Sequence, residues 1–410
     1  MHYHQGLAAS FTSSRIETRP NWAEVSLSAL RHNFRVLQAH VGAEVTICAV
    51  VKCNAYGHGV EECAPALEQA GAKWFGVTST DEGVLLREAG ITGRVLVLCG
   101  LYPGEEEDAL HHALTPAVFR LEDANALAQA ARRLRLEYRV PIHLKIDTGM
   151  TRLGIPFANL DSFAEGVKRL PEIELEGVFS HLASSEVLDD DGALQQIERF
   201  DAALRTLAAH GLRPRLRHLA NSGAVIARPG TWHNFVRPGL ALYGYEQPTL
   251  YRDGSLAADA PLLPLQRVLA WKTHVLGLRD VPAGQALGYG GAYVTPAPAR
   301  IAVVSVGYGD GLARKISVNG TTTSGAEPAR GHGQVLLRGQ RAPIVGRISM
   351  DLTLVDVTRV AGAAIGDEVV LIGSSGEQEI TAWDHARWAD TIVYETLCNL
   401  SKRVPRRHAG

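Results

Sequence analysis

Short apolar runs alternate with amphipathic segments along the chain from about residue 23 to about residue 255. Apolar runs bounded by turn residues are typical of buried strands, whereas apolar residues three and four positions apart are typical of helices. About eight strand–helix units follow one another, which is the number that closes a parallel (β/α)8 barrel. The pattern therefore predicts an α/β protein built on a TIM-like barrel.

The pattern changes near residue 260. Helical periodicity is absent until about residue 382, and strand-like segments such as "ARIAVVSV" and "DEVVLIG" lie between glycine and proline turns. This predicts a mostly antiparallel β-domain. We expect a barrel over residues 19–258 and a β-domain over residues 259–410, and leave open whether the first strand joins the β-domain. Residues 1–18 are expected to form a disordered extension.

The composition excludes several classes of protein. The formal net charge is -2 in 410 residues, so no basic surface for nucleic acid is expected. No apolar run is long enough to span a bilayer, and the first residues lack the apolar core of a signal peptide. The five cysteines show no metal-type pairing. These features predict a cytoplasmic enzyme or binding protein.

The segment "AVVKCNAYGHG" places Lys52 at the end of the first barrel strand and Tyr56 four positions later. In a TIM barrel the active-site groups lie at the carboxyl ends of the strands. A single lysine there usually extends its amine to water and has no catalytic role. Lys52 becomes a candidate because polar residues also end the other strands.

The fifth and sixth strands end in such residues. "HLKIDTGMTRLG" contains Lys145 and Asp147 on one face of the strand, with Arg152 in the following loop. A structural salt bridge is the simpler explanation of the first pair. The sixth strand ends in "FSHL", which contains His181, and a histidine at such a position is more often a satisfied core residue.

The seventh and eighth strands complete the set. "HLANSG" places Asn221 and Ser222 before a predicted helix, where Ser222 is either the N-cap or part of a phosphate site. "VRPGLALYG" places Arg237 among apolar residues, where it needs a partner, and Gly239 permits close approach of a ligand. A phosphate site, a hydrogen-bond acceptor for Arg237 and a carbonyl that forms a Schiff base with Lys52 together suggest pyridoxal 5'-phosphate (PLP).

Six motifs, in order, resemble the landmarks of bacterial alanine racemases, which are fold-type III PLP enzymes: "AVVKCNAYGHG", "HLKIDTGMTRLG", "HLANSG", "VRPGLALYG", "GYGDG" and "VGRISMD". The resemblance covers nearly the whole chain. It implies a cytoplasmic homodimer with shared active sites that interconverts L-alanine and D-alanine and supplies D-alanine for peptidoglycan. Four residues depart from the common pattern: Cys53 and Gly309, where alanine is commoner, Thr151, where glycine is usual, and Lys402, where tyrosine is frequent.

The resemblance also implies residue roles. Lys52 binds PLP and is one catalytic base, and Tyr289 of the partner subunit is the other. Arg152 and the backbone of Met350 contact the substrate carboxylate, and Tyr308 lines the entrance. Lys145 matches a lysine that is often carbamylated. The cofactor-binding residues implied are Lys52, Tyr56, Arg152, His181, Asn221, Ser222, Arg237, Gly239, Leu240 and Tyr394, with Arg237 at the pyridine nitrogen and no metal.

Four other functions stay open. A racemase of wider range, for example one acting on serine, has nearly the same sequence features. Amino-acid decarboxylases of the same fold type usually place a carboxylate at the ring nitrogen, which Arg237 argues against. A non-catalytic PLP carrier resembles a single barrel without the β-domain. A binding or structural module would use the same polar residues only as ion pairs.

Overall fold

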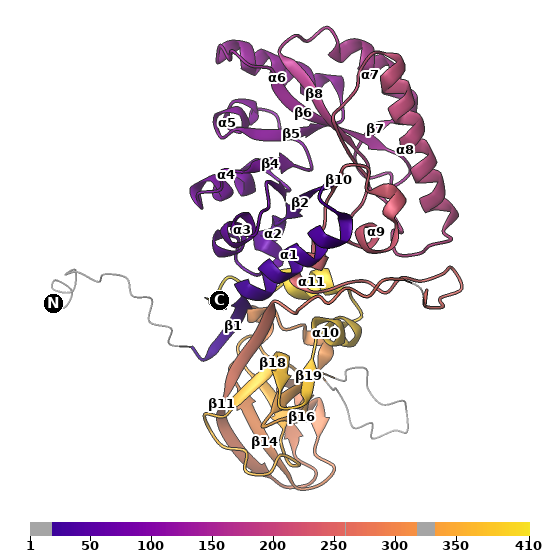
Figure 1. Ribbon diagram of the computed structural model, residues 1–410. Helices are drawn as coiled ribbons and strands as arrows, with labels where there is room; N and C mark the ends of the chain where they lie inside the picture. The colour runs from indigo at the N-terminus through magenta and orange to yellow at the C-terminus, as the bar shows by residue number, and fades with distance from the viewer. Residues whose placement is uncertain (1–18, 259, 318–332) are drawn as a thin grey trace, which may run out of the picture. The chain divides into compact units, whose positions relative to one another are not determined.

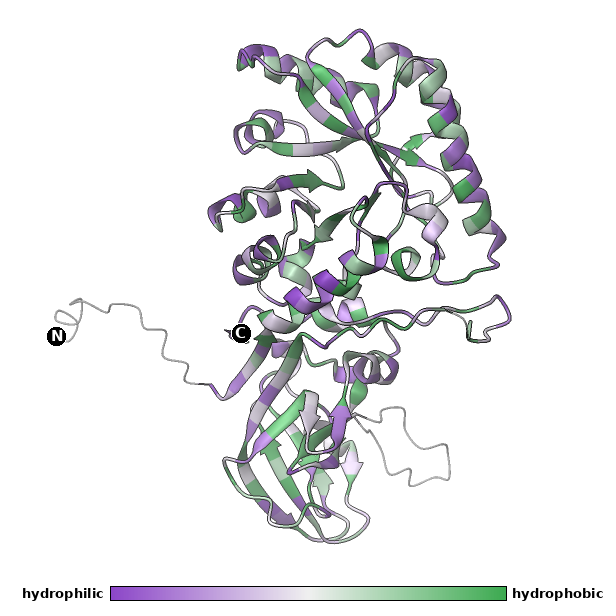
Figure 2. Cartoon of the chain, viewed as in Figure 1, coloured by the Kyte–Doolittle hydropathy of each residue, from purple (hydrophilic) through white to green (hydrophobic). Residues whose placement is uncertain are grey.

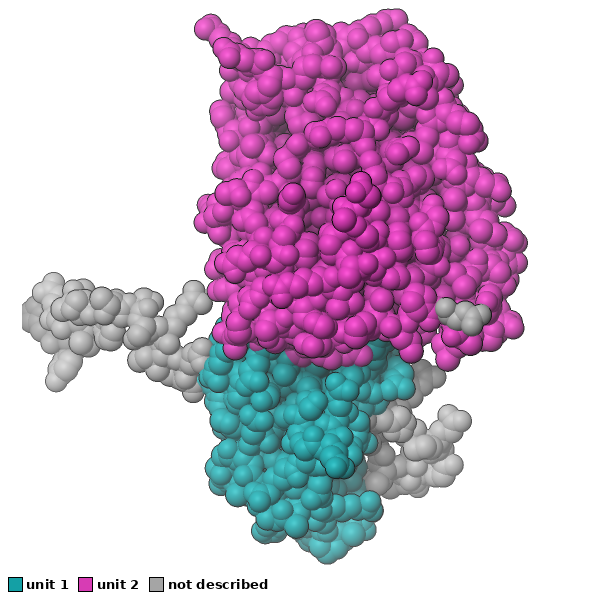
Figure 3. All heavy atoms as spheres, viewed as in Figure 1, with its two compact units in different colours: residues 1–24, 270–407 teal, residues 25–269, 408–410 magenta. Residues whose placement is uncertain are grey.

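The computed structural model describes residues 19–258, 260–317 and 333–410, so the predicted disordered extension, residues 1–18, lies outside the described residues. The chain divides into two compact units, which Figure 3 distinguishes by colour. We call residues 25–269 with 408–410 the barrel unit, and residues 19–24 with 270–407 the β-unit. The main division falls between Leu269 and Ala270.

Eight parallel strands form the sheet of the barrel unit, in the order β10-β2-β3-β4-β5-β6-β8-β9. They are β2 (Thr46–Val50), β3 (Trp74–Val77), β4 (Arg94–Val97), β5 (Leu114–Val118), β6 (Val140–Asp147), β8 (Ile173–Phe179), β9 (Leu216–His218) and β10 (Phe235–Val236). A ninth short strand, β7 (Ile155–Pro156), pairs with β6.

The two ends of this strand order are joined through β10. Its two residues pair with β2, and the preceding Asn234 binds the chain of β9. The Asn234 side chain accepts a hydrogen bond from the Arg217 amide at 2.9 Å and donates one to the Arg215 carbonyl at 2.7 Å. The predicted (β/α)8 barrel is therefore confirmed. Between its last two strands, β9 and β10, the Asn234 side chain makes the hydrogen bonds that a regular backbone ladder makes elsewhere.

Helices follow most of the barrel strands and cover the outside of the sheet (Figure 1). The main ones are α1 (Leu27–Val41), α3 (Val60–Gln69), α4 (Thr80–Glu88), α5 (Glu106–His111), α6 (Leu121–Arg133), α7 (Leu160–Val167), α8 (Asp191–Ala209) and α9 (Ser222–Ala227). Figure 2 shows polar and apolar residues on opposite faces of the long α8, as the three-and-four spacing predicts. The carboxylate of Asp190 caps its N-terminus by accepting a hydrogen bond from the Ala193 amide.

The β-unit contains a nine-stranded sheet in the order β19-β18-β15-β16-β17-β14-β11-β1-β20. Its strands are β1 (Asn21–Ser26), β11 (Leu269–Val281), β14 (Ala299–Val304), β15 (Gln334–Leu337), β16 (Gln340–Val345), β17 (Thr353–Asp356), β18 (Glu368–Ser375), β19 (Gln378–Ile380) and β20 (Arg406–Ala409). The pairings from β11 to β19 are antiparallel. The first strand of the chain thus pairs within this sheet, and the predicted β-domain is confirmed.

Smaller elements complete the β-unit. A hairpin of β12 (Ala286–Leu287) and β13 (Tyr293–Val294) encloses the short helix η4 (Tyr289–Gly291). The short helix η5 (Tyr308–Asp310) follows β14, and α10 (Ala382–Ala389) and α11 (Val393–Cys398) precede β20. Because η4, η5 and α11 carry Tyr289, Tyr308 and Tyr394, these elements determine where three candidate residues lie.

Candidate functional site

Lys52 begins a tight turn directly after β2. The turn is α2 (Lys52–Tyr56), and its residues Cys53, Asn54, Ala55 and Tyr56 all have φ between 52° and 54°. This is left-handed helical backbone, which costs about 1–2 kcal/mol for each residue that is not glycine. The structure buries Tyr56 and leaves Lys52 half-buried at the carboxyl end of a barrel strand.

Arg237 lies just after β10 and is only 4% exposed. Its guanidinium donates hydrogen bonds to the His218 ring at 2.7 Å and to the carbonyls of Ser180 at 2.7 Å and Leu219 at 3.3 Å. Burial lowers the pKa of Arg237 to about 10, so the group is still a cation at neutral pH. Among the described residues it has no carboxylate partner, so its charge lies among neutral groups.

A chain of hydrogen bonds continues from Arg237 into the barrel. Since a guanidinium only donates, His218 must accept at Nδ1 and carry its proton at Nε2. That proton bonds to His143 Nδ1 at 2.8 Å, so His143 carries its own proton at Nε2, 3.4 Å from the carboxylate of Glu176. Burial lowers the pKa of both histidines, which are therefore neutral. We call Arg237, His218, His143 and Glu176 the barrel relay.

Two arginines hold the far end of the barrel relay. Arg94 binds both oxygens of Glu176, at 3.1 and 2.7 Å, and Arg215 binds one of them. Burial alone would raise the pKa of Glu176, but its contacts with His143 and Arg94 outweigh burial and lower it to about 2. Glu176 is therefore an anion, and each ring in the relay has one defined tautomer.

Lys145 lies on β6 and is 6% exposed. Its amine is 5.5 Å from the ring centre of Phe179, and no described carboxylate pairs with it. Burial, together with the cations Arg237, Arg152 and Lys52, lowers its pKa to about 8. Asp147 does not form the salt bridge with Lys145 that was considered from the sequence. Its carboxylate instead accepts hydrogen bonds from the amides of Gly149 and Thr151 at 3.0 Å each.

His181 follows β8 and is affected by the same cations. Its pKa is lowered to about 3, first by burial and then, in decreasing order, by the cations Arg237, Arg152, Lys145 and Lys52. His181 is therefore neutral at physiological pH. Since all four cations act on this one ring, the structure brings them together at the carboxyl end of the barrel. Arg152 differs from Arg237 in being exposed.

The sequence left open whether Ser222 is the N-cap of its helix, and the structure shows that it is not. Asn221 caps α9 by accepting from the Ala224 amide at 3.1 Å. The Ser222 hydroxyl oxygen instead accepts from the amides of Gly239 and Ala241, at 2.9 and 3.3 Å. With its acceptor sites used in this way, the hydroxyl has its own proton left to donate to an anion.

Gly239 admits the Tyr56 side chain beside this hydroxyl. A Cβ atom on Gly239 would lie 2.3 Å from the Tyr56 hydroxyl oxygen, so no other residue fits here without a shift. The next amide, of Leu240, donates none of the hydrogen bonds found among the described residues. Tyr56, Ser222, Gly239 and Leu240 therefore form a small polar cradle with O–H and N–H groups.

The remaining candidates lie in the β-unit. Tyr289 is 70% exposed, Met350 52% and Tyr308 44%, whereas Tyr394 on α11 is half-buried. Tyr308 and Met350 are neighbours, because the Tyr308 amide bonds to the Ser349 carbonyl and the Gly309 amide to the Met350 carbonyl, each at 3.0 Å. Two large apolar groups thus lie exposed side by side on this unit.

Three members of the barrel relay were missed in the sequence analysis. His143 and Glu176 lie on β6 and β8, and His218 lies on β9. His143 shares its strand face with Lys145 by the period of two, which is a signal that could have identified it. Phe179 was also missed, although its ring stacks on His218 at 4.8 Å and lies beneath Arg237.

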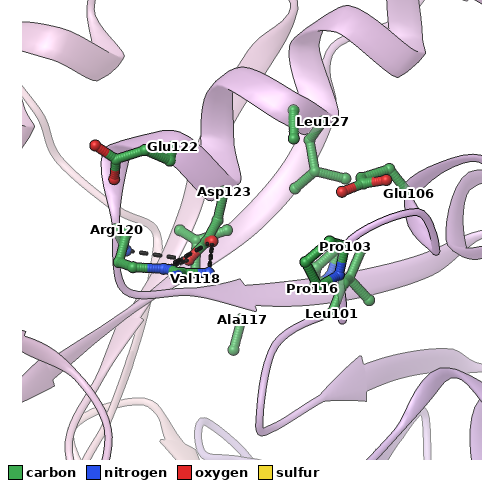
Figure 4. Close-up of a pocket in the computed structure, with 11 residues that line it drawn as sticks. Leu101, Pro103, Glu106, Pro116, Ala117, Val118, Arg120, Glu122, Asp123 and Leu127 are labelled. Atoms are coloured by element: carbon green, nitrogen blue, oxygen red, sulfur yellow. Dashed lines mark hydrogen bonds and ion pairs between the residues drawn. The ribbon is translucent and has the colours of Figure 1, made fainter.

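A separate cavity of about 280 Å³ lies beside β5 and α6 (Figure 4). Arg120 and Asp123 form an ion pair at its edge, and Glu106 and Glu122 also line it. None of the candidate residues lines this cavity. In residues 19–258, 260–317 and 333–410 there is no group of three potential metal ligands and no helix suited to crossing a membrane.

Family models match both parts of the chain. The model described as "Alanine racemase, N-terminal domain" matches residues 25–247, and that described as "Alanine racemase, C-terminal domain" matches residues 268–408. The alanine racemase of Symbiobacterium thermophilum is 41% identical over 392 residues, which are 96% of this chain and 98% of that protein. The second domain match argues against a single-barrel carrier.

Solved structures give the same result. The alanine racemase from D-cycloserine-producing Streptomyces lavendulae has a TM-score of 0.85 and 33% identity, over 96% of this chain and 97% of that one. The alanine racemase from Bartonella henselae, solved with covalently bound pyridoxal phosphate, has a TM-score of 0.81 and 28% identity, over 95% and 99% of the two chains.

Proposed function

Because the chain belongs to the alanine racemase family, we propose that it interconverts L-alanine and D-alanine with PLP as its cofactor. The observation that supports this most directly is the group of four cations, Lys52, Lys145, Arg152 and Arg237, without a carboxylate partner among the described residues. Clustered cations favour a bound anion. PLP carries a phosphate and a phenolic oxygen, and alanine carries a carboxylate.

The cradle fits the phosphate of PLP. Ser222 and Tyr56 have hydroxyl groups, and Leu240 has a backbone amide, next to Gly239, whose missing side chain makes room for the Tyr56 hydroxyl. Hydroxyl and amide donors bind phosphate oxygens well. We assign phosphate binding to these residues together with Tyr394, and place Asn221 as the cap that orients the Ser222 backbone.

Arg237 is proposed to donate a hydrogen bond to the pyridine nitrogen. Because its pKa of about 10 keeps it protonated, it donates this bond without giving up a proton. When bound, PLP supplies an electron sink that makes the α-proton of alanine acidic. An arginine in place of a carboxylate keeps that sink weak, which we expect to suppress transamination. His181, neutral at physiological pH, is assigned to support the ring.

Proton transfer is assigned to two bases on opposite faces of the α-carbon. The Lys52 amine, which also binds the cofactor covalently, removes or returns the proton on one face, and the Tyr289 hydroxyl acts on the other. Tyr289, Tyr308 and Met350 are exposed on the β-unit, which is expected if they act in a partner subunit. We therefore propose a homodimer with shared active sites, in which Arg152 and the Met350 amide bind the substrate carboxylate.

Lys145 is proposed to carry a carbamate. Carbon dioxide reacts only with a neutral amine, and a pKa of about 8 leaves a substantial neutral fraction near neutral pH. The modified side chain would be an anion facing Arg152. This would lower the positive charge of the cluster by two units for each chain, since a cation becomes an anion.

Substitution of Lys52 by alanine tests the proposal. The purified protein is expected to be yellow and to racemise alanine in a chiral chromatography assay, and Lys52→Ala should lose both covalent PLP and racemisation. Lys73→Ala is the matched control, because Lys73 is an exposed lysine of the same unit. A colourless native protein without affinity for PLP would contradict the proposal. The same assay with L-serine tests the wider substrate range.

The physiological role that we propose is the supply of D-alanine for peptidoglycan. Expression of the chain in a bacterium that lacks its own alanine racemase should restore growth without added D-alanine, and the Lys52→Ala variant should not. Growth that still requires D-alanine, despite measured racemase activity in the extract, would contradict this role.

A further inference from the structure

The last three residues of the chain belong to the barrel unit, although the residues before them belong to the β-unit. His408 Nε2 lies 2.8 Å from the backbone carbonyl of His58, and the other ring nitrogen lies 3.6 Å from the carboxylate of Glu62. The His408 side chain is 12% exposed. Gly410 accepts a hydrogen bond from Arg31 through its carbonyl, which fixes the end of the chain.

The His58 carbonyl lies next to the left-handed turn that begins at Lys52. Since a carbonyl only accepts, the His408 Nε2 proton is donated to it. The His58 ring in turn donates from Nδ1 to the carbonyls of Ala55 and Tyr56, both at 2.9 Å. His58 therefore connects the C-terminal tail to two of the four residues in left-handed conformation.

The contact between tail and turn is closely packed. Gly59 has φ of +96°, and a Cβ atom on it would lie 2.8 Å from His408 Nε2. The His58 ring stacks on Tyr243 at 4.4 Å, and the Tyr56 ring lies 5.0 Å from the same tyrosine. These contacts extend from His408 at the chain end to the Tyr56 side chain in the phosphate cradle.

We propose that His408 is a positioning residue that holds the left-handed turn, and with it Lys52 and Tyr56, in the geometry that binds PLP. Four residues in left-handed backbone are intrinsically unfavourable, so neighbouring contacts must maintain them. The tail supplies one such contact from far along the sequence. The inference rests on the proposed function in one respect, which is that the ligand is PLP. The contact of His408 with the turn does not depend on that function.

The test compares His408→Ala, His408→Gln and Arg31→Ala with the native protein. Alanine removes the donor, glutamine places an amide N–H near the position of Nε2, and Arg31→Ala removes only the Gly410 contact. Apo-protein is titrated with PLP by absorbance, and hydrogen exchange of amides 53–60 is measured without PLP. Loss of one hydrogen bond and its packing should weaken PLP binding about tenfold.

The expected result is weaker PLP binding and faster exchange of amides 53–60 in His408→Ala, with both restored in His408→Gln and unchanged in Arg31→Ala. PLP affinity and exchange of His408→Ala within about twofold of the native protein would overturn the proposal, as would failure of glutamine to restore them. If native protein binds no PLP, the proposed function fails, whereas the exchange measurement still decides whether His408 holds the turn.

Discussion

The two units present their candidate residues in opposite ways. In the barrel unit Arg237 and Lys145 are 4% and 6% exposed and lie among defined neighbours, whereas in the β-unit Tyr289 and Met350 are 70% and 52% exposed. Buried polar groups fixed by hydrogen bonds are suited to hold a cofactor in one orientation. Exposed aromatic and apolar groups are suited to complete a site on another surface. The barrel unit is therefore preorganised to hold a ligand, whereas the exposed residues of the β-unit complete a site only in the homodimer that we propose.

Substitution of Tyr289 is expected to give the largest effect. Tyr289→Phe removes the hydroxyl but keeps the exposed ring, so stability should not change while α-proton exchange of L-alanine falls about 10³-fold. Exchange of the D-alanine α-proton, whose removal we assign to Lys52, should fall much less. The measurement is the solvent exchange rate of each enantiomer in deuterium oxide, with Tyr138→Phe as the control at another exposed tyrosine. Equal losses for both enantiomers would reject the two-face assignment.

Hybrid dimers sharpen the same prediction. Mixing Lys52→Ala with Tyr289→Phe should restore part of the activity if each site combines one residue from each subunit. The subunits must be shown to exchange, for example with tagged chains. No recovery after proven exchange would mean that the β-unit completes a site within its own chain.

The barrel relay could not be predicted as a unit from the sequence. The polar residues at the strand ends could be predicted one by one, because strand periodicity and loop position indicate which residues lie at the carboxyl ends of the sheet. The contact of His143 with His218 joins residues 75 positions apart on neighbouring parts of the barrel interior. Sequence patterns indicate that such a side chain is buried, but not which partner it meets.

The left-handed turn after Lys52 escaped prediction for a different reason. Cys53, Asn54, Ala55 and Tyr56 are not glycine, and local propensity places such residues in right-handed backbone. Their conformation depends on His58, on Asn54, which accepts from the Val60 amide at 2.8 Å, and on the distant tail. Local propensity fails here because side-chain contacts, one of them from the distant tail, hold the backbone in this conformation.

The second prediction concerns buried histidines in the two units. His218→Phe removes the ring nitrogens that bind Arg237 and His143, so each of these two buried groups loses one hydrogen bond, and it should cost about 3 kcal/mol of unfolding free energy. Among the described residues the His385 ring of the β-unit makes one hydrogen bond, to the Leu371 carbonyl at 2.8 Å, so His385→Phe should cost about 1 kcal/mol. Urea unfolding of the apo-proteins measures both. Equal losses would show that the relay adds nothing beyond a single buried hydrogen bond.

The third prediction is an acid sensitivity that differs between the units. Burial lowers the pKa of His218 and His143 in the folded protein, that of His181 to about 3, and that of His385 to about 4. Below pH 6.5 these histidines bind protons in the unfolded chain but stay neutral in the folded protein. The free energy of unfolding therefore falls as the pH falls from 6.5 towards each folded pKa. Each histidine contributes about 1.4 kcal/mol per pH unit in that range, and above pH 7 no change is expected from them.

Because three of these four rings lie in the barrel unit, that unit should lose stability first. Hydrogen exchange of the apo-protein at pH 7.5, 6 and 5 resolves the two units separately. His385→Gln is the control, since it removes the β-unit's contribution and should flatten only that unit's pH dependence. Earlier loss of protection in the β-unit would contradict the assignment.

The smallest expected effect concerns an exposed loop of the barrel unit next to Arg152. Thr151 has φ of 55°, a conformation in which a β-branched residue is strained by about 1–2 kcal/mol. Thr151→Gly removes this strain but adds about 0.5–1 kcal/mol of unfolded-state entropy, so a net gain of about 0.5 kcal/mol is expected. Thr151→Ala keeps the left-handed strain and should show no such gain.

If the loop matters for substrate binding, Thr151→Gly should also raise KM for alanine, because Arg152 becomes less fixed while the buried cations are unaffected. An unchanged KM together with the stability gain would mean that Thr151 affects folding alone. The barrel would then determine the positions of the buried cations Arg237 and Lys145 without any contribution from this loop.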